Sequence, residues 1–207
     1  MIIKKVTLGT VSTNCYLLID ENTGLGALID CPCYSEVLVD LLKSKELKKL
    51  KYIILTHGHY DHILGLDKIK EMTNAEVLIH KDDAACLTDS KRSLAMFTGN
   101  TQVSVEPDVI LNDNDVINLG GLKIKVIHTP GHTVGSCSFQ VDNAVFTGDT
   151  LFYLTVGRTD LPTGDYIKII SSIKKLAALY GDYDIYPGHS RKTTLSFERE
   201  NNKYFKE

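Results

Sequence analysis

Four short apolar runs in this sequence each end in a turn that carries metal-ligand side chains. The run from Tyr52 to Leu55 precedes the densest turn, which reads Thr56-His57-Gly58-His59-Tyr60-Asp61-His62. Short apolar runs are typical of buried strands, and functional side chains often lie on the loops that leave such strands. The fold must therefore bring several strand ends together at one site.

The spacing inside the histidine-dense turn predicts two neighbouring metal positions. His57 and His59 are two residues apart, so in extended chain they point to the same side and can reach one metal. Asp61 and His62 come after the chain turns, so they point elsewhere and suit a second metal. Gly58 has no side chain, so the backbone can come close to the site at this position. Imidazole and carboxylate groups are ligands that zinc and iron favour. The alternative is a polar loop that holds histidines by chance, and three histidines in six positions argue against it.

Three later segments repeat the pattern of an apolar run, a Gly or Pro, and one ligand-type side chain. Taken singly, each is a weak signal, because a lone His after Gly is more often an exposed loop residue. Added to the dense turn, they predict a shared site. The segments are Thr129-Pro130-Gly131-His132-Thr133, Thr147-Gly148-Asp149-Thr150 and Tyr186-Pro187-Gly188-His189.

Local patterns predict strands followed by helices in each half of the chain. Alternating and apolar runs predict strands at 2–8, 15–20 and 26–30, and hairpins within 116–128 and 136–147. Helical spacing predicts helices over 35–50 and 166–180 and a polar helix over 194–205, whereas 88–108 carries few signals. We therefore expect an α+β fold, a four-layer αββα sandwich of two mixed β-sheets flanked by helices. Residues 1–207 should form a single domain, with the metal site at one edge between the sheets.

The charge and hydrophobic content of the chain indicate which kinds of molecule it can bind. The chain has 207 residues, a net charge of −3 and 43% hydrophobic residues, which suits a sizeable core and gives no basic footprint for nucleic acid. No apolar run approaches the roughly 20 residues of a membrane-spanning helix, and the first residues lack the apolar stretch of a signal peptide. We expect a cytoplasmic protein with a small-molecule substrate and no nucleic-acid or membrane partner. Oligomeric state is not indicated.

The set of candidate ligands resembles that of the metallo-β-lactamase fold superfamily, over a span from Asn14-Cys15-Tyr16 to His189. The resemblance implies two divalent metal ions, most simply zinc, with iron and manganese as alternatives. It implies a first metal held by His57, His59 and His132. It implies a second metal held by Asp61, His62 and His189, with Asp149 bridging the two.

The same resemblance implies a hydrolase in which a metal-bridging hydroxide attacks the substrate while Asp61 orients it and carries its proton. The segments Leu151-Phe152-Tyr153 and Gly157-Arg158-Thr159-Asp160 resemble the glyoxalase II-like branch, whose members hydrolyse thioesters such as hydroxyacylglutathione. Arg158 then binds an anionic part of the substrate or pairs with Asp160, and Tyr153 forms a pocket wall. Asp30 orients a metal ligand or serves as a turn residue.

Three other functions remain open. A persulfide dioxygenase of this fold uses one iron, which His57, His132 and Asp149 would hold here. A non-catalytic metal-binding domain would bind metal without turnover. Antibiotic hydrolysis is disfavoured for two reasons. Class B β-lactamases with a similar ligand set carry Cys at the position of Asp149, and this chain lacks a secretion signal.

Overall fold

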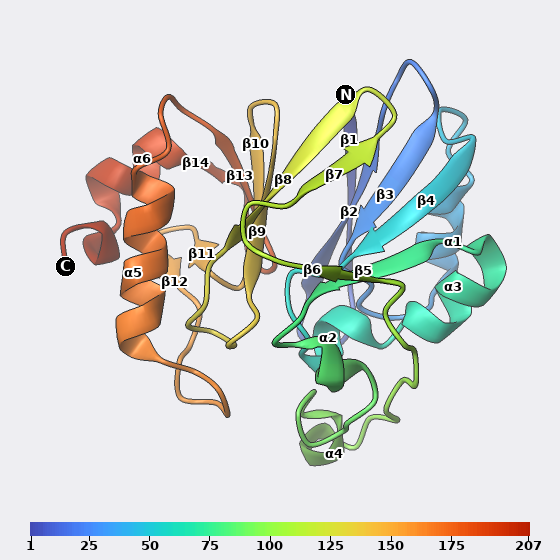
Figure 1. The fold of residues 1–207 in the computed structure, drawn as a ribbon, viewed down its shortest axis with the longest axis horizontal. Helices are drawn as coiled ribbons and strands as arrows, with labels where there is room; N and C mark the ends of the chain where they lie inside the picture. Colours follow the sequence, from blue (N-terminus) through green and yellow to red (C-terminus); the bar gives the residue numbers. More distant parts are fainter.

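The computed structural model describes residues 1–207 and contains two six-stranded β-sheets that face each other, with helices on both outer sides (Figure 1). A separate two-stranded hairpin lies beside the second sheet. This layering confirms the predicted α+β sandwich with two mixed sheets. None of the helices combines the length and the apolar composition needed to cross a bilayer.

The first sheet comes from the N-terminal half of the chain. Its strands follow one another in sequence order, antiparallel at first and parallel from the third strand onward. The strands are β1 (Ile2–Leu8), β2 (Thr13–Ile19), β3 (Leu25–Ile29), β4 (Lys49–Ile54), β5 (Glu76–His80) and β6 (Val109–Leu111). The accompanying helices are α1 (Glu36–Leu42), α2 (Tyr60–Ile63), α3 (Leu66–Thr73), the 3-10 helix η1 (Ala84–Leu87) and α4 (Ala95–Thr98).

The second sheet comes from the C-terminal half and has the order β14-β13-β10-β9-β8-β7. Only the β10–β13 pair is parallel. Its strands are β7 (Val116–Leu119), β8 (Leu122–His128), β9 (Cys137–Val141), β10 (Ala144–Gly148), β13 (Asp184–Pro187) and β14 (Thr193–Thr194). The remaining elements are β11 (Leu151–Phe152), β12 (Thr155–Val156), α5 (Tyr166–Ala177), α6 (Leu195–Asn201) and the 3-10 helix η2 (Lys203–Phe205).

Three hydrophobic clusters occupy the spaces between the layers. Strand β2 is buried on both faces: Leu17 belongs to the cluster under the helices, and Leu18 belongs to the cluster between the sheets. Phe139 and Phe146 from the second sheet fill the same central cluster. A smaller cluster, which includes Ile173 of α5, lies behind the second sheet. Burying side chains on both faces explains why several strands read as continuous apolar runs.

The predicted helix over 35–50 is too long. Ser35 caps α1 as expected, since its Oγ accepts the Leu38 N–H at 3.2 Å, but the helix ends at Leu42. Lys49 and Leu50 instead begin β4, which pairs in parallel with β3. Pairing within the sheet outweighs the helical spacing of the leucines here, because the strand buries its apolar side chains on the sheet.

Candidate metal centre

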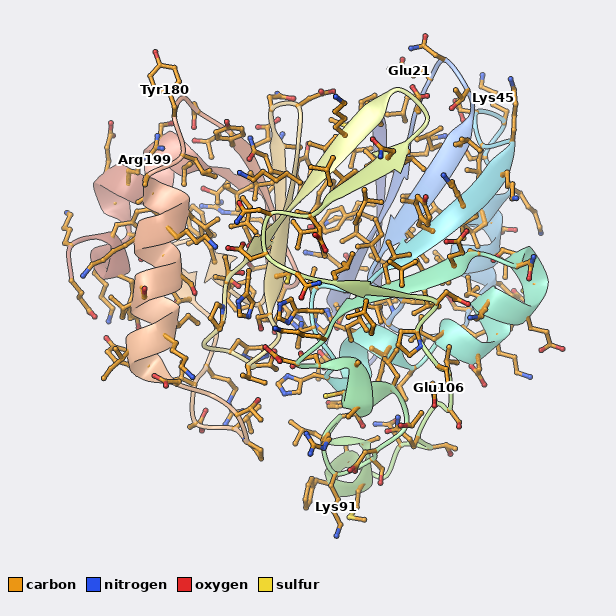
Figure 2. The ribbon with its side chains drawn as sticks, viewed as in Figure 1. Glu21, Lys45, Lys91, Glu106, Tyr180 and Arg199 are labelled. Carbon is orange, nitrogen blue, oxygen red and sulfur yellow. The ribbon has the colours of Figure 1, made fainter.

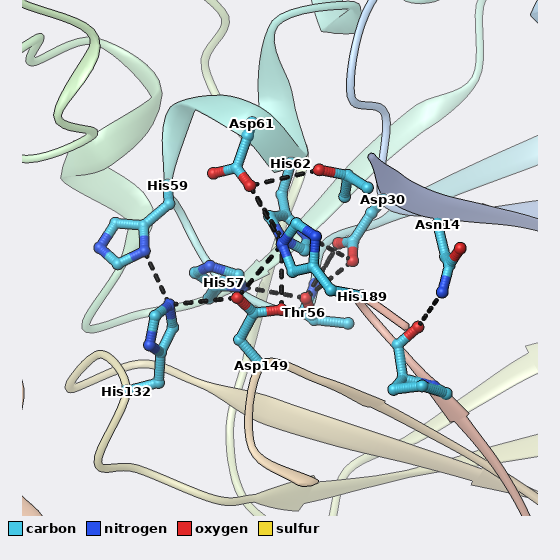
Figure 3. A network of polar contacts seen from close by, with 12 residues as sticks. Asn14, Asp30, Thr56, His57, His59, Asp61, His62, His132, Asp149 and His189 are labelled. Atoms are coloured by element: carbon cyan, nitrogen blue, oxygen red, sulfur yellow. Dashed lines mark hydrogen bonds and ion pairs between the residues drawn. The ribbon is translucent and has the colours of Figure 1, made fainter. Parts of the chain in front are cut away.

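The seven side chains predicted as metal ligands lie together at one edge of the sandwich, where strands of both sheets end (Figure 3). The loop after β4 and the following α2 bring four of them from the first sheet. The loops after β8, β10 and β13 bring the other three from the second sheet. Segments up to 132 residues apart in sequence thus converge, from His57 to His189.

Three imidazoles form the first group. The candidate ligand atoms of His57, His59 and His132 lie within 4.8 Å of one another, and all three side chains are buried. His59 Nδ1 is 2.9 Å from His132 Nε2, and the His57 ring stands nearly perpendicular to both neighbouring rings. Converging imidazole nitrogens of this kind suit a zinc- or iron-type cation.

The second group consists of one carboxylate and two imidazoles, from Asp61, His62 and His189. Asp61 Oδ2 is 3.2 Å from His189 Nε2 and 3.6 Å from His62 Nε2. Asp149 lies between the groups: its Oδ1 is 3.4 Å from His62 Nε2, and its Oδ2 is 3.5 Å from His132 Nε2. A carboxylate that faces both groups has the geometry of a shared ligand.

Buried atoms without hydrogen-bond partners indicate that the donor set fits cations. Nε2 of His57, His59 and His62 and Oδ1 of Asp149 are buried and accept or donate no hydrogen bond. Leaving a buried polar group unsatisfied costs about 1–3 kcal/mol, so four in one place require an explanation. Divalent metal ions bound by the two groups would satisfy all four atoms, and the nitrogen and oxygen chemistry of these atoms agrees with such ions.

Charges in the centre differ between the two groups. Burial, reinforced by neighbouring imidazoles, lowers the pKa of His57 well below its usual value and that of His59 to about 3. Burial opposes protonation of His189 as well, but hydrogen bonds to Asp149 and Asp61 raise its pKa to about 10. The imidazoles of His57 and His59 are therefore neutral and ready to ligate, whereas the second group holds a proton that an incoming cation would replace.

Asp30 lies next to the second group and contacts the candidate ligand His62. Its Oδ2 is 2.8 Å from His62 Nδ1, and its Oδ1 accepts the Thr56 N–H at 2.8 Å. The Asp30 backbone has a φ of +61°, which is uncommon for a non-glycine residue. Asp30 therefore contacts both the His62 imidazole and the start of the histidine-dense turn, and its role in orienting a metal ligand stays a prediction.

Asp83 is a site residue that the sequence patterns did not reveal. Its buried carboxylate accepts the Gly58 N–H at 2.9 Å, the Gly135 N–H at 2.9 Å and the Thr133 hydroxyl at 2.7 Å. It thus connects the His57–His59 turn to the loop that carries His132. Burial raises the pKa of Asp83, although these three hydrogen bonds act against the rise. No local signal distinguishes Asp83 from Asp82, because only the fold brings its partners together.

Two glycines allow the close approach that the site needs. A Cβ added at Gly58 would lie 2.3 Å from Cys86 Cβ, and one at Gly188 would lie 2.3 Å from Asp149 Oδ1. Any side chain at these positions would displace the ligand loops. This agrees with the expectation that Gly58 serves backbone packing.

The centre opens into a cavity of about 890 Å³ whose wall includes Asp61, Arg158 and His189. The Arg158 guanidinium forms a two-point ion pair with Asp160, with both N–O distances 2.7 Å. Tyr153, predicted as a pocket wall, is not among the lining residues. Its ring stacks on Phe197 and lies under the Arg191 guanidinium, 3.6 Å from the ring centroid.

Comparisons with known proteins agree with this geometry. Residues 8–189 match the family model described as the metallo-beta-lactamase superfamily. A relative from Haemophilus influenzae named hydroxyacylglutathione hydrolase GloC is 34% identical over 196 residues, covering 92% of each chain.

Two solved structures are also similar. One, titled BLEG-1 B3 metallo-beta-lactamase, has a TM-score of 0.92 at 30% identity and full coverage of both chains. The other, titled TTHA1623 in a di-iron-bound form, has a TM-score of 0.84 at 32% identity and covers 97% of this chain and 99% of its own.

Proposed function

Because the chain belongs to the metallo-β-lactamase superfamily, we propose that it is a dinuclear metal-dependent hydrolase that cleaves thioesters. The convergence of seven nitrogen and oxygen donors beside an open cavity carries this proposal, since four of their atoms lack any other partner. Asp149 faces both groups, and a complete second group supports two ions rather than one. The similarity to a structure in a di-iron-bound form adds support for a pair of ions, and zinc, iron or manganese would suit the donors.

When bound, divalent cations at such a centre activate water and polarise a carbonyl group. In thioester hydrolysis the water oxygen bonds to the carbonyl carbon, the C–S bond breaks, and the products are a carboxylate and a thiol. Asp61 lines the cavity and can hold the proton that water loses, because the hydroxyl of Thr13 and the imidazole of His189 fix Asp61 Oδ2 in place. Arg158, on the same wall, can orient the polar part of the substrate.

The choice of thioester rests on two observations. The segment Gly157-Arg158-Thr159-Asp160 resembles the glyoxalase II-like branch, and the similar GloC protein is named a hydroxyacylglutathione hydrolase. We propose that residues 1–207 act as one hydrolase domain, because donors from both sheets complete the centre.

Metal analysis combined with anaerobic kinetics tests the proposal. Protein purified without added metal should contain two ions per chain and hydrolyse S-lactoylglutathione or a simpler thioester without oxygen. His62→Gln should lose anaerobic turnover, whereas Asp160→Asn, on the exposed side of the Arg158 pair, should retain both ions.

Other outcomes identify the alternatives. One iron per chain with oxygen-dependent turnover of a persulfide would assign a dioxygenase that uses His57, His132 and Asp149. Two ions without turnover of any thioester would assign a metal-binding domain. Turnover of a β-lactam alone would assign a β-lactamase, as the similar BLEG-1 protein is named.

A further inference from the structure

The cavity beside the candidate metal centre has a largely apolar wall. Away from the metal groups, its lining includes five large apolar side chains from two separate parts of the chain. These side chains are Leu94, Phe97, Phe152, Val156 and Leu161. A pocket lined in this way recognises an apolar group and uses a few polar groups for orientation.

Positive charge on this wall is scarce. Arg158 is its one Lys or Arg side chain, and the bidentate pair with Asp160 already engages it. The cationic residues next to His189 are also engaged: Arg191 lies over the Tyr153 ring, and Lys192 is 2.8 Å from Asp184. Glutathione carries two carboxylates at neutral pH, and the wall offers no second Lys or Arg side chain to receive them.

The loop that carries α4 (Ala95–Thr98), called the α4 loop below, contributes an exposed aromatic ring to the cavity. Phe97 is 69% exposed although it lines the wall, so a bound group could bury much of its surface. The loop is fixed at its base, where the Tyr60 N–H donates to the Ser93 carbonyl at 2.8 Å and the Gln102 amide donates to the Cys86 carbonyl at 3.0 Å. Figure 2 shows Lys91 pointing outward from this loop, away from the body of the molecule.

Building on the proposed thioester hydrolysis, we infer that the substrate carries an uncharged apolar chain that lies between the α4 loop and the β11–β12 hairpin. Phe97 and Leu94 contact this chain from one side, and Phe152, Val156 and Leu161 from the other. The chain belongs to the acyl group or to the thiol, and both share the same recognition chemistry. A thiol that carries two carboxylates, such as glutathione, is a poorer fit.

Two substrate series test the inference and distinguish the two sources. The first varies the acyl chain from two to eight carbons on the small uncharged thiol N-acetylcysteamine, and the second joins an acetyl group to alkyl thiols of increasing length. In one series kcat/KM should rise about fourfold per methylene until the cavity is full, because burying a methylene contributes about 0.8 kcal/mol. The series that shows the slope identifies the apolar side of the substrate.

Matched variants locate the effect. Phe97→Ser and Leu161→Ser should flatten the slope, because they remove apolar wall. Tyr180→Ser replaces an aromatic ring that is 97% exposed and points to solvent at the far end of the molecule, and it should leave the slope unchanged (Figure 2).

Binding of non-hydrolysable S-alkyl thioethers, measured by calorimetry on the metal-loaded protein, gives a readout that is independent of turnover. Affinity should rise with chain length and fall in Phe97→Ser. Flat slopes in both series, with S-lactoylglutathione as the best substrate, would overturn the inference and leave thioester hydrolysis standing. If no thioester is cleaved, the proposed function fails. Thioether affinities that do not change with chain length would separately overturn the inference of an apolar substrate chain.

Discussion

Asp149 faces both halves of the candidate metal centre through its two carboxylate oxygens. Oδ1 lies near His62 and Oδ2 near His132, at 3.4 and 3.5 Å from their Nε2 atoms. Burial alone would raise the pKa of Asp149, but the charge of His62 and the hydrogen bond with His189 hold it well below its usual value. A permanently charged carboxylate at this position can balance two cations.

Replacing Asp149 should therefore remove both ions. We expect Asp149→Ala to reduce bound metal from two ions to nearly none and to lower thioester turnover by more than about 100-fold, since loss even of groups behind the ligands costs about 10–100-fold. Metal content by mass spectrometry and anaerobic kinetics measure both effects. A variant that keeps two ions and wild-type turnover would contradict the assignment.

Asp83 contributes to stability through the loops that it joins. Asp83→Ala leaves the backbone N–H groups of Gly58 and Gly135 without their acceptor in a buried place. We expect the free energy of unfolding to fall by about 3 kcal/mol, and metal affinity to fall with it. Urea titration measures the first effect. Asp82→Ala, the exposed neighbour, should change stability by less than about 0.5 kcal/mol, and equal losses in the two variants would show that Asp83 is not the connection.

At the scale of elements, Asp108 attaches α3 to the first sheet. Its Oδ2 accepts the Val77 N–H of β5 at 2.7 Å and pairs with Lys70 of α3. Burial acts against ionisation, but these two contacts lower the pKa of Asp108 below its usual value. A carboxyl group whose pKa is lowered in the folded state stabilises the fold when the pH is above the pKa of the unfolded state. This stabilisation disappears as the pH falls through the pKa of the folded state.

Asp108→Asn should therefore reduce stability at pH 6 and flatten the loss of stability as pH falls below about 4, because the group no longer titrates. Chemical denaturation at a series of pH values gives both quantities. Glu71→Gln, on the exposed face of the same helix, serves as the control and should leave the acid limb unchanged. Identical acid limbs in wild type and Asp108→Asn would reject this account of the attachment.

Helix and strand periodicity predicted most elements but not all of their ends. The sequence predicts α5 because Ile169, Ile173 and Leu176 recur on one face of the helix. Asp165 caps α5 by accepting the Lys168 N–H at 3.0 Å. The end of α1 was not visible, because the leucines that follow it are buried by strand pairing and loop packing rather than by a longer helix.

At the scale of the whole molecule, the candidate metal centre connects the two sheets. Four of its side chains follow β4, and the other three follow β8, β10 and β13. Asn14 adds a further connection, since its amide in β2 donates to the Pro187 and Ser190 carbonyls on either side of His189. Ion binding should therefore stabilise the global fold and not only a loop.

Metal removal tests this connection. A ligand at 100 times its dissociation constant adds about 2.7 kcal/mol, so a chelator should lower Tm by roughly 5–10 °C in a chain of this size. Calorimetry with and without chelator measures the shift. Arg158→Ala should show the same shift as wild type, whereas His132→Ala should show little, and a chelator without effect on metal-loaded wild type would refute the coupling.

Residue types and their spacing along the chain were sufficient to predict most of the strands, the seven candidate ligands and the sandwich architecture, because these depend on local periodicity and on the chemistry of imidazole and carboxylate. Only the folded chain decided that Asp83 joins two candidate ligand loops, that Tyr153 packs on Phe197 and not on the cavity wall, and that apolar side chains from two parts of the chain meet in the cavity wall. These features depend on contacts between segments far apart in sequence. Neither the composition of a segment nor its periodicity records which distant segment it will meet.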